Sequence, residues 1–199
     1  MDGSGEASRA KSDLRSIIRR SRAERRSQDL DADEASSVAQ HVLDLEEIRN
    51  ACSSELPIAC YVSRPEEPST QVLRARLHEA GATLVVPRVE NNDLVWIRVT
   101  PDTRWTANRW GIDEPTGPAL DGTPSAWIIP ALAIDSDGYR LGQGGGFYDR
   151  ALQGIDEDIP VVAIVFEDEV LDRVPREAHD RRVDIVVTPD RVRWLSMPD

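Results

Sequence analysis

The sequence predicts one α/β domain, in which helices flank a mixed, mainly parallel β-sheet. Short apolar runs that are typical of buried strands, such as residues 58–62 and 160–166, alternate with longer segments of helical periodicity. The chain of 199 residues suits one domain with a substantial core. Residues 1–8 are small and polar, and we expect a flexible N-terminus there, ahead of a single domain over residues 9–199.

Helices are predicted from apolar spacing and from residues that favour helix ends. Apolar residues recur at helical spacing from residue 14 to about residue 26, and again over residues 33–50. A third helix is expected to start with Ser69 or Thr70 as its N-cap and to end at Gly81.

The remaining strands are predicted from apolar runs bounded by turn residues. Residues 83–89 and 94–99 flank a turn at 91–93 and indicate a β-hairpin. Further strands are expected over residues 128–135 and 183–187, the latter being the last strand of the chain.

The composition restricts the partners and the compartment. A net charge of −12 argues against a nucleic-acid or membrane partner, because phosphate groups would be repelled over most of the surface. No apolar run approaches the roughly 18–20 residues needed to span a bilayer, and the N-terminus lacks the apolar core of a signal peptide. With only Cys52 and Cys60 and no zinc-like histidine spacing, we expect a reduced, cytoplasmic setting.

Residues 140–150, with the sequence RLGQGGGFYDR, carry the strongest functional signal in the chain. Four of the five residues from Gly142 to Gly146 are glycine. Because glycine lacks Cβ and readily adopts positive φ, such a loop can turn successive backbone N–H groups toward one anion. The start of a helix over residues 148–152 would also favour an anion. The segment therefore predicts a phosphate-binding loop, and a tight turn that binds nothing is the alternative.

The loop does not match two common nucleotide fingerprints. A P-loop requires a Gly-Lys-Ser/Thr ending, which is missing here. In a dinucleotide fingerprint that starts at Gly142 and Gly144, the third glycine, needed for close helix–strand packing, would fall at Phe147. Hydride-transfer chemistry is therefore disfavoured.

An arginine-rich helix near the N-terminus opposes the overall charge. Eight basic and only two acidic residues lie between Arg9 and Arg26, and Lys11 is the only lysine in the chain. Lys11 and Arg15 are four residues apart and share one helical face. Because an ammonium is a compact point charge and a guanidinium is not, the lone lysine indicates a place that needs an ammonium. A basic patch on an acidic protein would also complement a polyphosphate. A solvated basic helix with an accidental lysine is the alternative.

Six segments in a fixed order resemble the 5-formyltetrahydrofolate cyclo-ligase family, also called 5,10-methenyltetrahydrofolate synthetases. They are KSDLR at residues 11–15, EPST at 67–70, GIDEP at 111–115, PALAID at 130–135, YRLGQGGGFYDR at 139–150 and VDIVVTP at 183–189. The glycine segment is highly specific, and the ordered set covers nearly the whole chain, from Lys11 to Leu195.

The resemblance implies ring closure of 5-formyltetrahydrofolate to 5,10-methenyltetrahydrofolate, with Mg²⁺-dependent use of ATP and release of ADP and phosphate. In such enzymes the formyl oxygen attacks the γ-phosphate, and N10 of the folate then closes on the activated carbon. Phosphorylation turns a poor leaving group, the amide-like oxygen, into a good one. The protein's share is positioning and charge neutralisation.

The resemblance also implies roles for individual residues. Contacts to ATP fall to Lys11, Arg15, Arg140, Leu141, Gly142, Gln143, Gly144, Gly145, Gly146, Phe147 and Tyr148. Val62, Glu67 and Tyr148 would contact the folate, with Glu67 accepting the N–H donors of the pterin edge. Asp149 and Asp184 would reach Mg²⁺, a hard ion that prefers carboxylate, water and phosphate oxygens.

Each carboxylate also has a simpler interpretation. The alternatives are an exposed turn residue for Glu67, a helix cap or a partner of Arg150 for Asp149, and a surface strand residue for Asp184.

The chain departs from the family pattern at three places. Gln143 stands where an aromatic or other large residue is frequent, and Ala131 stands where glycine is frequent. Residues 68–69 replace a hydrophobic–acidic pair, so the loop that is expected to hold the pterin is the least family-like part.

We therefore expect a monomeric, Mg²⁺-dependent cyclo-ligase whose partners are ATP and 5-formyltetrahydrofolate. Two other functions stay open: an ATP-using enzyme that acts on another N-formyl or pterin-like substrate, and a nucleotide-binding module without turnover. The presence of Asp149 beside Lys11, Arg140 and Tyr148 favours catalysis, because a module that only binds nucleotide needs no metal carboxylate.

Overall fold

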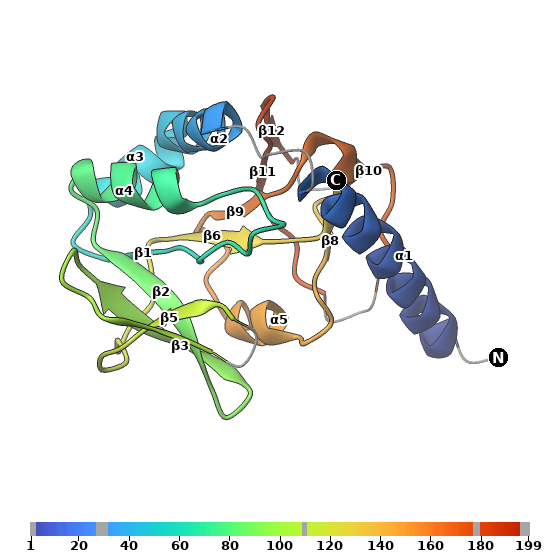
Figure 1. The fold of residues 1–199 in the computed structure, drawn as a ribbon, viewed down its shortest axis with the longest axis horizontal. Coiled ribbons are helices and arrows are strands. Elements are labelled where there is room, and N and C mark those ends of the chain that lie inside the picture. Colours follow the sequence, from blue (N-terminus) through green and yellow to red (C-terminus); the bar gives the residue numbers. More distant parts are fainter. Residues whose placement is uncertain (1–2, 27–31, 109–110, 177–179, 196–199) are drawn as a thin grey trace.

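The structure is a computed structural model that describes residues 3–26, 32–108, 111–176 and 180–195 (Figure 1). Its centre is a seven-stranded sheet with the strand order β12-β11-β9-β6-β1-β2-β3. These strands are β1 (Ile58–Ala59), β2 (Leu84–Glu90), β3 (Asp93–Val99), β6 (Ala126–Pro130), β9 (Val161–Ile164), β11 (Ile185–Val187) and β12 (Val192–Trp194). The inner strands pair in parallel, whereas β3 and β12 add antiparallel edges. The predicted mixed, mainly parallel sheet is confirmed.

Helices and two small sheets surround this centre. The helices are α1 (Gly3–Arg26), α2 (Ala32–Asp44), α3 (Glu46–Cys52), α4 (Gln71–Glu79), α5 (Phe147–Ala151) and the 3-10 helix η1 (Glu167–Glu169). One small sheet joins β10 (Val170–Leu171), β7 (Ala133–Asp135) and β8 (Arg140–Leu141), and the other joins β4 (Trp105–Ala107) and β5 (Asp113–Pro115). Among the described residues, no helix has both the length and the apolar character of a membrane span.

Alternating side chains of the strands build one core on each face of the sheet. Ile58, Ile128 and Val162 point to the face covered by α2, α3 and α4, where they meet residues such as Val42 and Leu73. Their neighbours in sequence, Ala59, Ile129 and Ala163, point to the opposite face, where Leu152 at the end of α5 packs against them. Figure 1 shows the three helices on one side of the sheet and α5 on the other. Both faces are buried, as expected for a parallel sheet.

Helix α1 packs outside these two layers, against the small sheet that precedes the glycine loop. Its buried Ile18 joins Leu132, Ala133 and Leu141 in a third apolar cluster. The helix starts at Gly3, so that residues 3–8 are helical where the sequence suggested a flexible end. Packing through Ile18 thus places the basic side of the helix beside residues from the second half of the chain.

Most predicted elements are present, with three differences. The helix expected over residues 33–50 is two helices, because the backbone is extended at Leu45 (φ −66°, ψ 130°). The strand expected over residues 128–135 is divided between β6 and β7, which belong to different sheets. The strand expected to be last is followed by β12, which pairs antiparallel with it. The hairpin is confirmed, and Asn91 and Asn92 form its turn with positive φ, as a tight two-residue turn requires.

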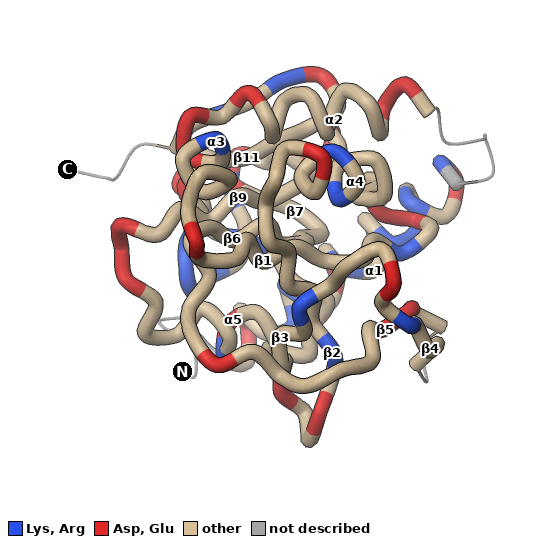
Figure 2. Tube along the Cα trace, turned by 90° about the vertical axis from the view of Figure 1, so that its left-hand side faces the viewer, with Lys and Arg blue, Asp and Glu red and all other residues tan. Residues whose placement is uncertain are grey.

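The acidic residues are spread over many elements of the surface. Figure 2 shows them at the ends of helices, in loops and at the tip of the β2–β3 hairpin. The basic residues of α1 are therefore a local exception to a net charge of −12. This contrast favours an anionic ligand near α1.

Candidate active site

A pocket of about 280 Å³ lies at the carboxyl ends of the parallel strands. Tyr61 and Val62, which follow β1, line it, as do Pro130 and Ala131 at the end of β6. Ligands of open α/β sheets characteristically bind at this edge, because loops that follow parallel strands meet there. The pocket is therefore the candidate active site.

The pocket brings together nearly all residues that the sequence suggested. Its lining includes Lys11, Arg15, Val62, Glu67, Arg140, Leu141, Gly142, Gln143, Gly144, Gly145, Gly146, Phe147, Tyr148 and Asp149. These residues come from α1, from the loop after β1 and from the glycine loop between β8 and α5. Segments far apart in the chain thus form one cavity, and Asp184 is the one candidate outside it.

The glycine loop is open toward the pocket and is supported by α1. Gly144 and Gly146 have φ of +100° and +65°, conformations that favour glycine. A Cβ on Gly144 would come within 3.4 Å of Cζ of Arg15, which shows how closely the loop approaches α1. The Nε of Arg15 donates to the carbonyl oxygen of Gly142 at 2.9 Å. The loop is therefore not a free-standing turn.

Two buried cations lie beside this loop and are each paired with a carboxylate. Lys11 is 6% exposed, and its Nζ is 2.7 Å from Oδ2 of Asp180. Arg140 pairs with Asp149 and donates to the carbonyl oxygen of Arg181 at 2.8 Å. Burial lowers the pKa of Arg140, whereas Asp149 and Asp180 raise it. Two of the cations at this end, Lys11 and Arg140, are thus each offset by a carboxylate within the protein.

The partner of Asp149 differs from the simpler interpretation of this residue. Asp149 pairs with Arg140, and Arg150 instead binds Asp93 on the β2–β3 hairpin at 2.8 Å. Asp149 therefore belongs to the pocket and not to a local pair within α5.

Gln143, one of the departures from the family pattern, is held by α1. Arg19 donates to its side-chain oxygen at 3.0 Å and to its backbone oxygen at 2.9 Å. With Arg15, this contact fixes two successive positions of the loop. The arginine-rich face of α1 thus positions the loop through Arg19 as well as Arg15.

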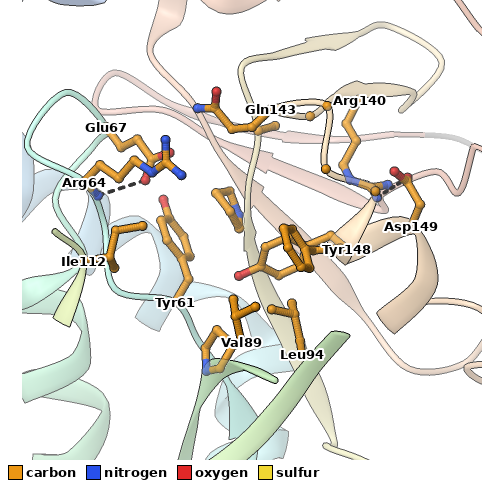
Figure 3. A pocket seen from close by; sticks show the side chains of 18 of the residues that line it. Tyr61, Arg64, Glu67, Val89, Leu94, Ile112, Arg140, Gln143, Tyr148 and Asp149 are labelled. Carbon is orange, nitrogen blue, oxygen red and sulfur yellow. Dashed lines mark hydrogen bonds and ion pairs between the residues drawn. The ribbon is translucent and has the colours of Figure 1, made fainter. Parts of the chain in front are cut away.

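The other end of the pocket is built around a buried carboxylate (Figure 3). Glu67 is 5% exposed, so the interpretation as an exposed turn residue is wrong. Its Oε2 accepts a hydrogen bond from the backbone N–H of Arg64 at 2.9 Å. Burial raises the pKa of Glu67, and the charges of Arg22 and Arg64 oppose the rise.

Two tyrosines lie between Glu67 and the glycine loop. Tyr61 is buried, and its hydroxyl has no hydrogen-bond partner among the described residues. Figure 3 shows Tyr61 and Tyr148 with their hydroxyl groups in the pocket, with Val89 and Leu94 below them. Burial, followed by the charge of Glu67, raises the pKa of both tyrosines well above its ordinary value. Both therefore remain protonated near neutral pH and can donate a hydrogen bond to a ligand.

Asp184 lies at the amino ends of the parallel strands, whereas the pocket lies at their carboxyl ends. It immediately precedes β11, and its Oδ2 accepts a hydrogen bond from the backbone N–H of Val161, the first residue of β9, at 2.8 Å. The amino ends of parallel strands are separated from the pocket by the length of the strands. Burial raises the pKa of Asp184, and its position fits a role in joining two strands. We assign it no part in the site.

Sequence reasoning missed several residues of the pocket. Asp180 lies four residues before Asp184 in the same charged segment, and nothing in the local sequence distinguishes the aspartate that reaches the pocket. Tyr61 carried a weak signal, because it follows directly after a buried strand at its carboxyl end. Arg64 carried none, because a loop arginine is usually solvated.

The fold and the pocket define an α/β protein in which a glycine loop flanked by cations lies across one cavity from a buried carboxylate. The model of the 5-formyltetrahydrofolate cyclo-ligase family matches residues 7–189. The chain therefore belongs to the 5-formyltetrahydrofolate cyclo-ligase family.

Individual relatives agree with this assignment. The chain is 37% identical over 144 residues to a 5-formyltetrahydrofolate cyclo-ligase of Mycolicibacterium smegmatis, covering 67% of this chain and 74% of the relative. It is 32% identical over 143 residues to the Escherichia coli K12 protein of the same name, covering 68% and 79%. The solution structure of Aquifex aeolicus 5,10-methenyltetrahydrofolate synthetase is similar with a TM-score of 0.76 at 28% identity, covering 95% of this chain and 94% of that one.

Proposed function

We propose that the protein cyclises 5-formyltetrahydrofolate to 5,10-methenyltetrahydrofolate at the expense of ATP, releasing ADP and phosphate. The observation that carries the proposal is one continuous pocket with the glycine loop and its cations at one end and buried Glu67 at the other. Membership of the cyclo-ligase family supports the same reaction.

The glycine-loop end is assigned to ATP. Lys11, Arg15 and Arg140 supply positive charge, and the backbone of residues 141–148 supplies N–H groups. A triphosphate carries more negative charge than these groups now balance within the protein, because Asp149 and Asp180 already offset two of the cations. This favours a metal ion as part of the bound nucleotide.

Mg²⁺ fits this end of the pocket. Asp149 and Asp180 provide two carboxylates, and no larger cluster of metal-ligating side chains occurs in the described part of the chain. Mg²⁺ is commonly held by one or two carboxylates together with phosphate oxygens and water, so this donor set suits a metal that arrives with ATP. Mg²⁺ would neutralise charge that develops on the phosphates. In this proposal Asp180 has the Mg²⁺-binding role that the sequence suggested for Asp184.

The Glu67 end is assigned to the folate. A carboxylate can accept two N–H donors of a pterin edge, and the buried setting of Glu67 makes such bonds strong. Val62 and Ile112 contribute apolar side chains to the lining of the pocket. Tyr148 lies between the two ends and is assigned to contacts with both substrates.

This arrangement brings the formyl oxygen of the folate against the γ-phosphate of ATP. The oxygen attacks phosphorus, ADP leaves, and N10 then attacks the activated carbon, loses its proton and expels phosphate with the former formyl oxygen. The residues of the chain act by orienting both substrates and by placing cations beside the transferred group. Expulsion of water by the apolar wall strengthens these interactions.

The direct test is turnover of the purified protein with Mg-ATP and 5-formyltetrahydrofolate. We expect the near-ultraviolet absorbance of the methenyl product to appear, with ADP formed in equal amount. No absorbance change under conditions in which ATP demonstrably binds would contradict the proposal and favour another N-formyl or pterin-like substrate. We further propose that the protein acts as a monomer in the cytoplasm. Sedimentation of the purified protein tests the monomeric state.

A further inference from the structure

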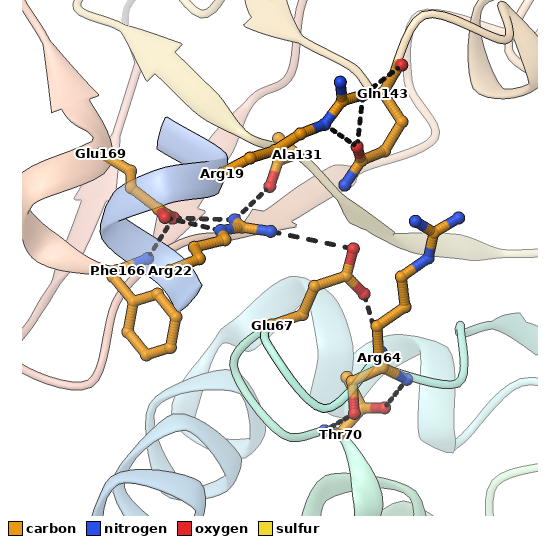
Figure 4. Close-up of polar contacts among 10 residues, drawn as sticks. Arg19, Arg22, Arg64, Glu67, Thr70, Ala131, Gln143, Phe166 and Glu169 are labelled. Carbon is orange, nitrogen blue, oxygen red and sulfur yellow. Dashed lines mark hydrogen bonds and ion pairs between the residues drawn. The ribbon is translucent and has the colours of Figure 1, made fainter. Parts of the chain in front are cut away.

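Arg22 of α1 is 1% exposed and is held on two sides by protein groups (Figure 4). Its Nε and Nη2 donate to the two oxygens of Glu169 at 2.6 and 2.8 Å. Nη2 also donates to the carbonyl oxygen of Ala131 at 2.7 Å. Ala131 lines the pocket, so Arg22 lies directly behind the wall of the active site.

The third nitrogen of this guanidinium points toward the site. Nη1 is buried and has no hydrogen-bond partner among the described residues, yet it lies 3.8 Å from Oε1 of Glu67. A buried donor without a partner is costly, so its position needs an explanation. Figure 4 shows the carboxylate of Glu67 between Arg22 on one side and the backbone of Arg64 on the other.

The buried cluster formed by Arg22, Glu67 and Glu169 carries one positive and two potential negative charges. Glu169 takes the bidentate contact, and Glu67 lies at the remaining edge of the guanidinium. Other titratable or charged groups that face Glu67 are Arg64 and Glu66 on its own loop, Tyr61, Tyr148, and Glu34 across a small crevice. Among the described residues of α1, Arg22 is thus the cation that reaches Glu67.

We propose that Arg22 is a positioning residue of the active site, whose Nη1 keeps Glu67 ionised and directed into the pocket, ready to accept the N–H donors of the pterin. The proposal rests on the function proposed above for Glu67. It links the helix that fixes the glycine loop to the carboxylate that binds the other substrate. Helix anchoring does not require this contact, because Glu169 and Ala131 already bind Arg22, and Arg25 separately binds Asp168 at 2.6 Å.

The first test needs no substrate and compares two variants, E169Q and R22M/E169Q. The amide introduced by E169Q keeps an oxygen for the backbone N–H of Phe166, which now donates to Glu169 at 2.9 Å. The double variant R22M/E169Q then differs from E169Q only by the loss of the Arg22 guanidinium. It leaves no unpaired charge at position 169. A nearby cation favours the ionised carboxylate, so we expect the Glu67 pKa in R22M/E169Q to be about one unit higher than in E169Q. Carbon-13 NMR of the labelled carboxyl groups, assigned with E67Q, measures this shift.

The second test is kinetic. At pH 7 we expect R22M/E169Q to raise the KM for 5-formyltetrahydrofolate about tenfold relative to E169Q, because Glu67 loses the group that directs it into the pocket. The kcat and the KM for ATP should change less than about twofold. The acid limb of the kcat/KM profile for the folate should move to higher pH, because more Glu67 is protonated at each pH. The control variant R25Q/D168N removes a surface ion pair between the same helix, α1, and η1, and should change none of these values.

Each result decides the proposal. An unchanged Glu67 pKa with an unchanged folate KM would overturn it and leave Arg22 as a helix anchor. A parallel rise of both KM values with a lower melting temperature would overturn it as well, since that is the pattern of general destabilisation. Failure of the wild-type protein to turn over 5-formyltetrahydrofolate would contradict the proposed function, while the NMR comparison would still decide whether Arg22 controls Glu67.

Discussion

At the scale of single residues, the site depends on charged groups that are buried and paired. Lys11 and Arg140 are each buried against a carboxylate, and Glu67 is buried with one oxygen fixed by the backbone. Burial strengthens such contacts but makes them sensitive to shape, because water cannot replace a lost partner. Exchanges that preserve charge or size should therefore still have large effects here.

Lys11→Arg tests whether the site requires an ammonium. The larger, planar guanidinium does not fit the place in which Nζ lies 2.7 Å from Asp180, although the charge is unchanged. We expect kcat/KM for ATP to fall at least about tenfold, and the folate KM to change little. Steady-state kinetics with Arg9→Lys, an exposed exchange on the same helix, provide the control. Full activity of Lys11→Arg would refute the lone-lysine argument without touching the family assignment.

Glu67→Gln tests the acceptor at the other end of the pocket. The amide keeps the size of the side chain but presents a donor where the carboxylate presents an acceptor. Hydrogen bonds to charged groups contribute about 1.5–3 kcal/mol, so we expect the KM for 5-formyltetrahydrofolate to rise by roughly 10- to 100-fold. The ATP KM should be unchanged, and Glu66→Gln on the same loop should behave like the wild type. If the folate KM of Glu67→Gln equals that of the wild type, Glu67 does not bind the pterin.

At the scale of elements, the glycine loop and α1 work as one unit. The loop takes its open shape from glycines with positive φ, and Arg15 and Arg19 of α1 hold its carbonyl oxygens. Carbonyl groups that are bound from outside leave the loop's N–H groups available for a ligand. The helix therefore shapes the loop as well as supplying charge.

Gly144→Ala tests this coupling. The alanine backbone must adopt a φ near +100°, which costs roughly 1–2 kcal/mol of strain. The added methyl group would also lie 3.4 Å from Cζ of Arg15. We expect the KM for ATP to rise about tenfold, while far-ultraviolet circular dichroism stays unchanged. Gly5→Ala, in the exposed part of α1 with no neighbour within 4 Å, should leave the kinetics unaltered. An unchanged ATP KM for Gly144→Ala would show that the loop does not bind the nucleotide.

At the scale of the whole molecule, the sheet holds three distant segments at one edge. The loop after β1 brings Glu67, the loop after β8 brings the glycines, and α1 reaches both from the start of the chain. Strands β11 and β12, at one end of the strand order, are linked to η1 by Glu167. Glu167 binds Arg191, Arg193 and Thr188. This network stabilises the fold outside the pocket.

Glu167→Gln tests the contribution of that network to stability. The hydrogen bond from Arg191, together with Thr188 and Arg193, lowers the Glu167 pKa to about 2. A carboxylate with a depressed pKa stabilises the fold above its ordinary pKa, and this stability is lost as the pH falls toward 2. We expect Glu167→Gln to lower the melting temperature at pH 7 by roughly 2–4 °C, and the difference from wild type to shrink below about pH 4. Exposed Glu157→Gln is the control, and a difference that persists at pH 2 would contradict this account.

Much of this organisation could be predicted from the sequence, for reasons that differ by element. The β2–β3 hairpin and the glycine loop follow from local turn chemistry and apolar patterns, which short segments carry in themselves. Asp180 could not be chosen over Asp184, because only the path of the chain between η1 and β11 decides which side chain reaches the pocket. Arg22 could not be singled out either, since its hydrogen-bond partners, Glu169 and Ala131, lie more than one hundred residues away in the sequence. The resemblance placed Lys11, Glu67 and the glycine loop in one site, but sequence patterns could not predict the individual side-chain pairs that join these segments.

If the pocket places the formyl oxygen against the γ-phosphate as proposed, this oxygen leaves with the phosphate. The most direct measurement uses 5-formyltetrahydrofolate labelled with oxygen-18 in the formyl group, with Mg-ATP, and mass spectrometry of the released phosphate. We expect one labelled oxygen in the phosphate that is released with each methenyl product. Unlabelled phosphate, released in step with the product, would contradict it.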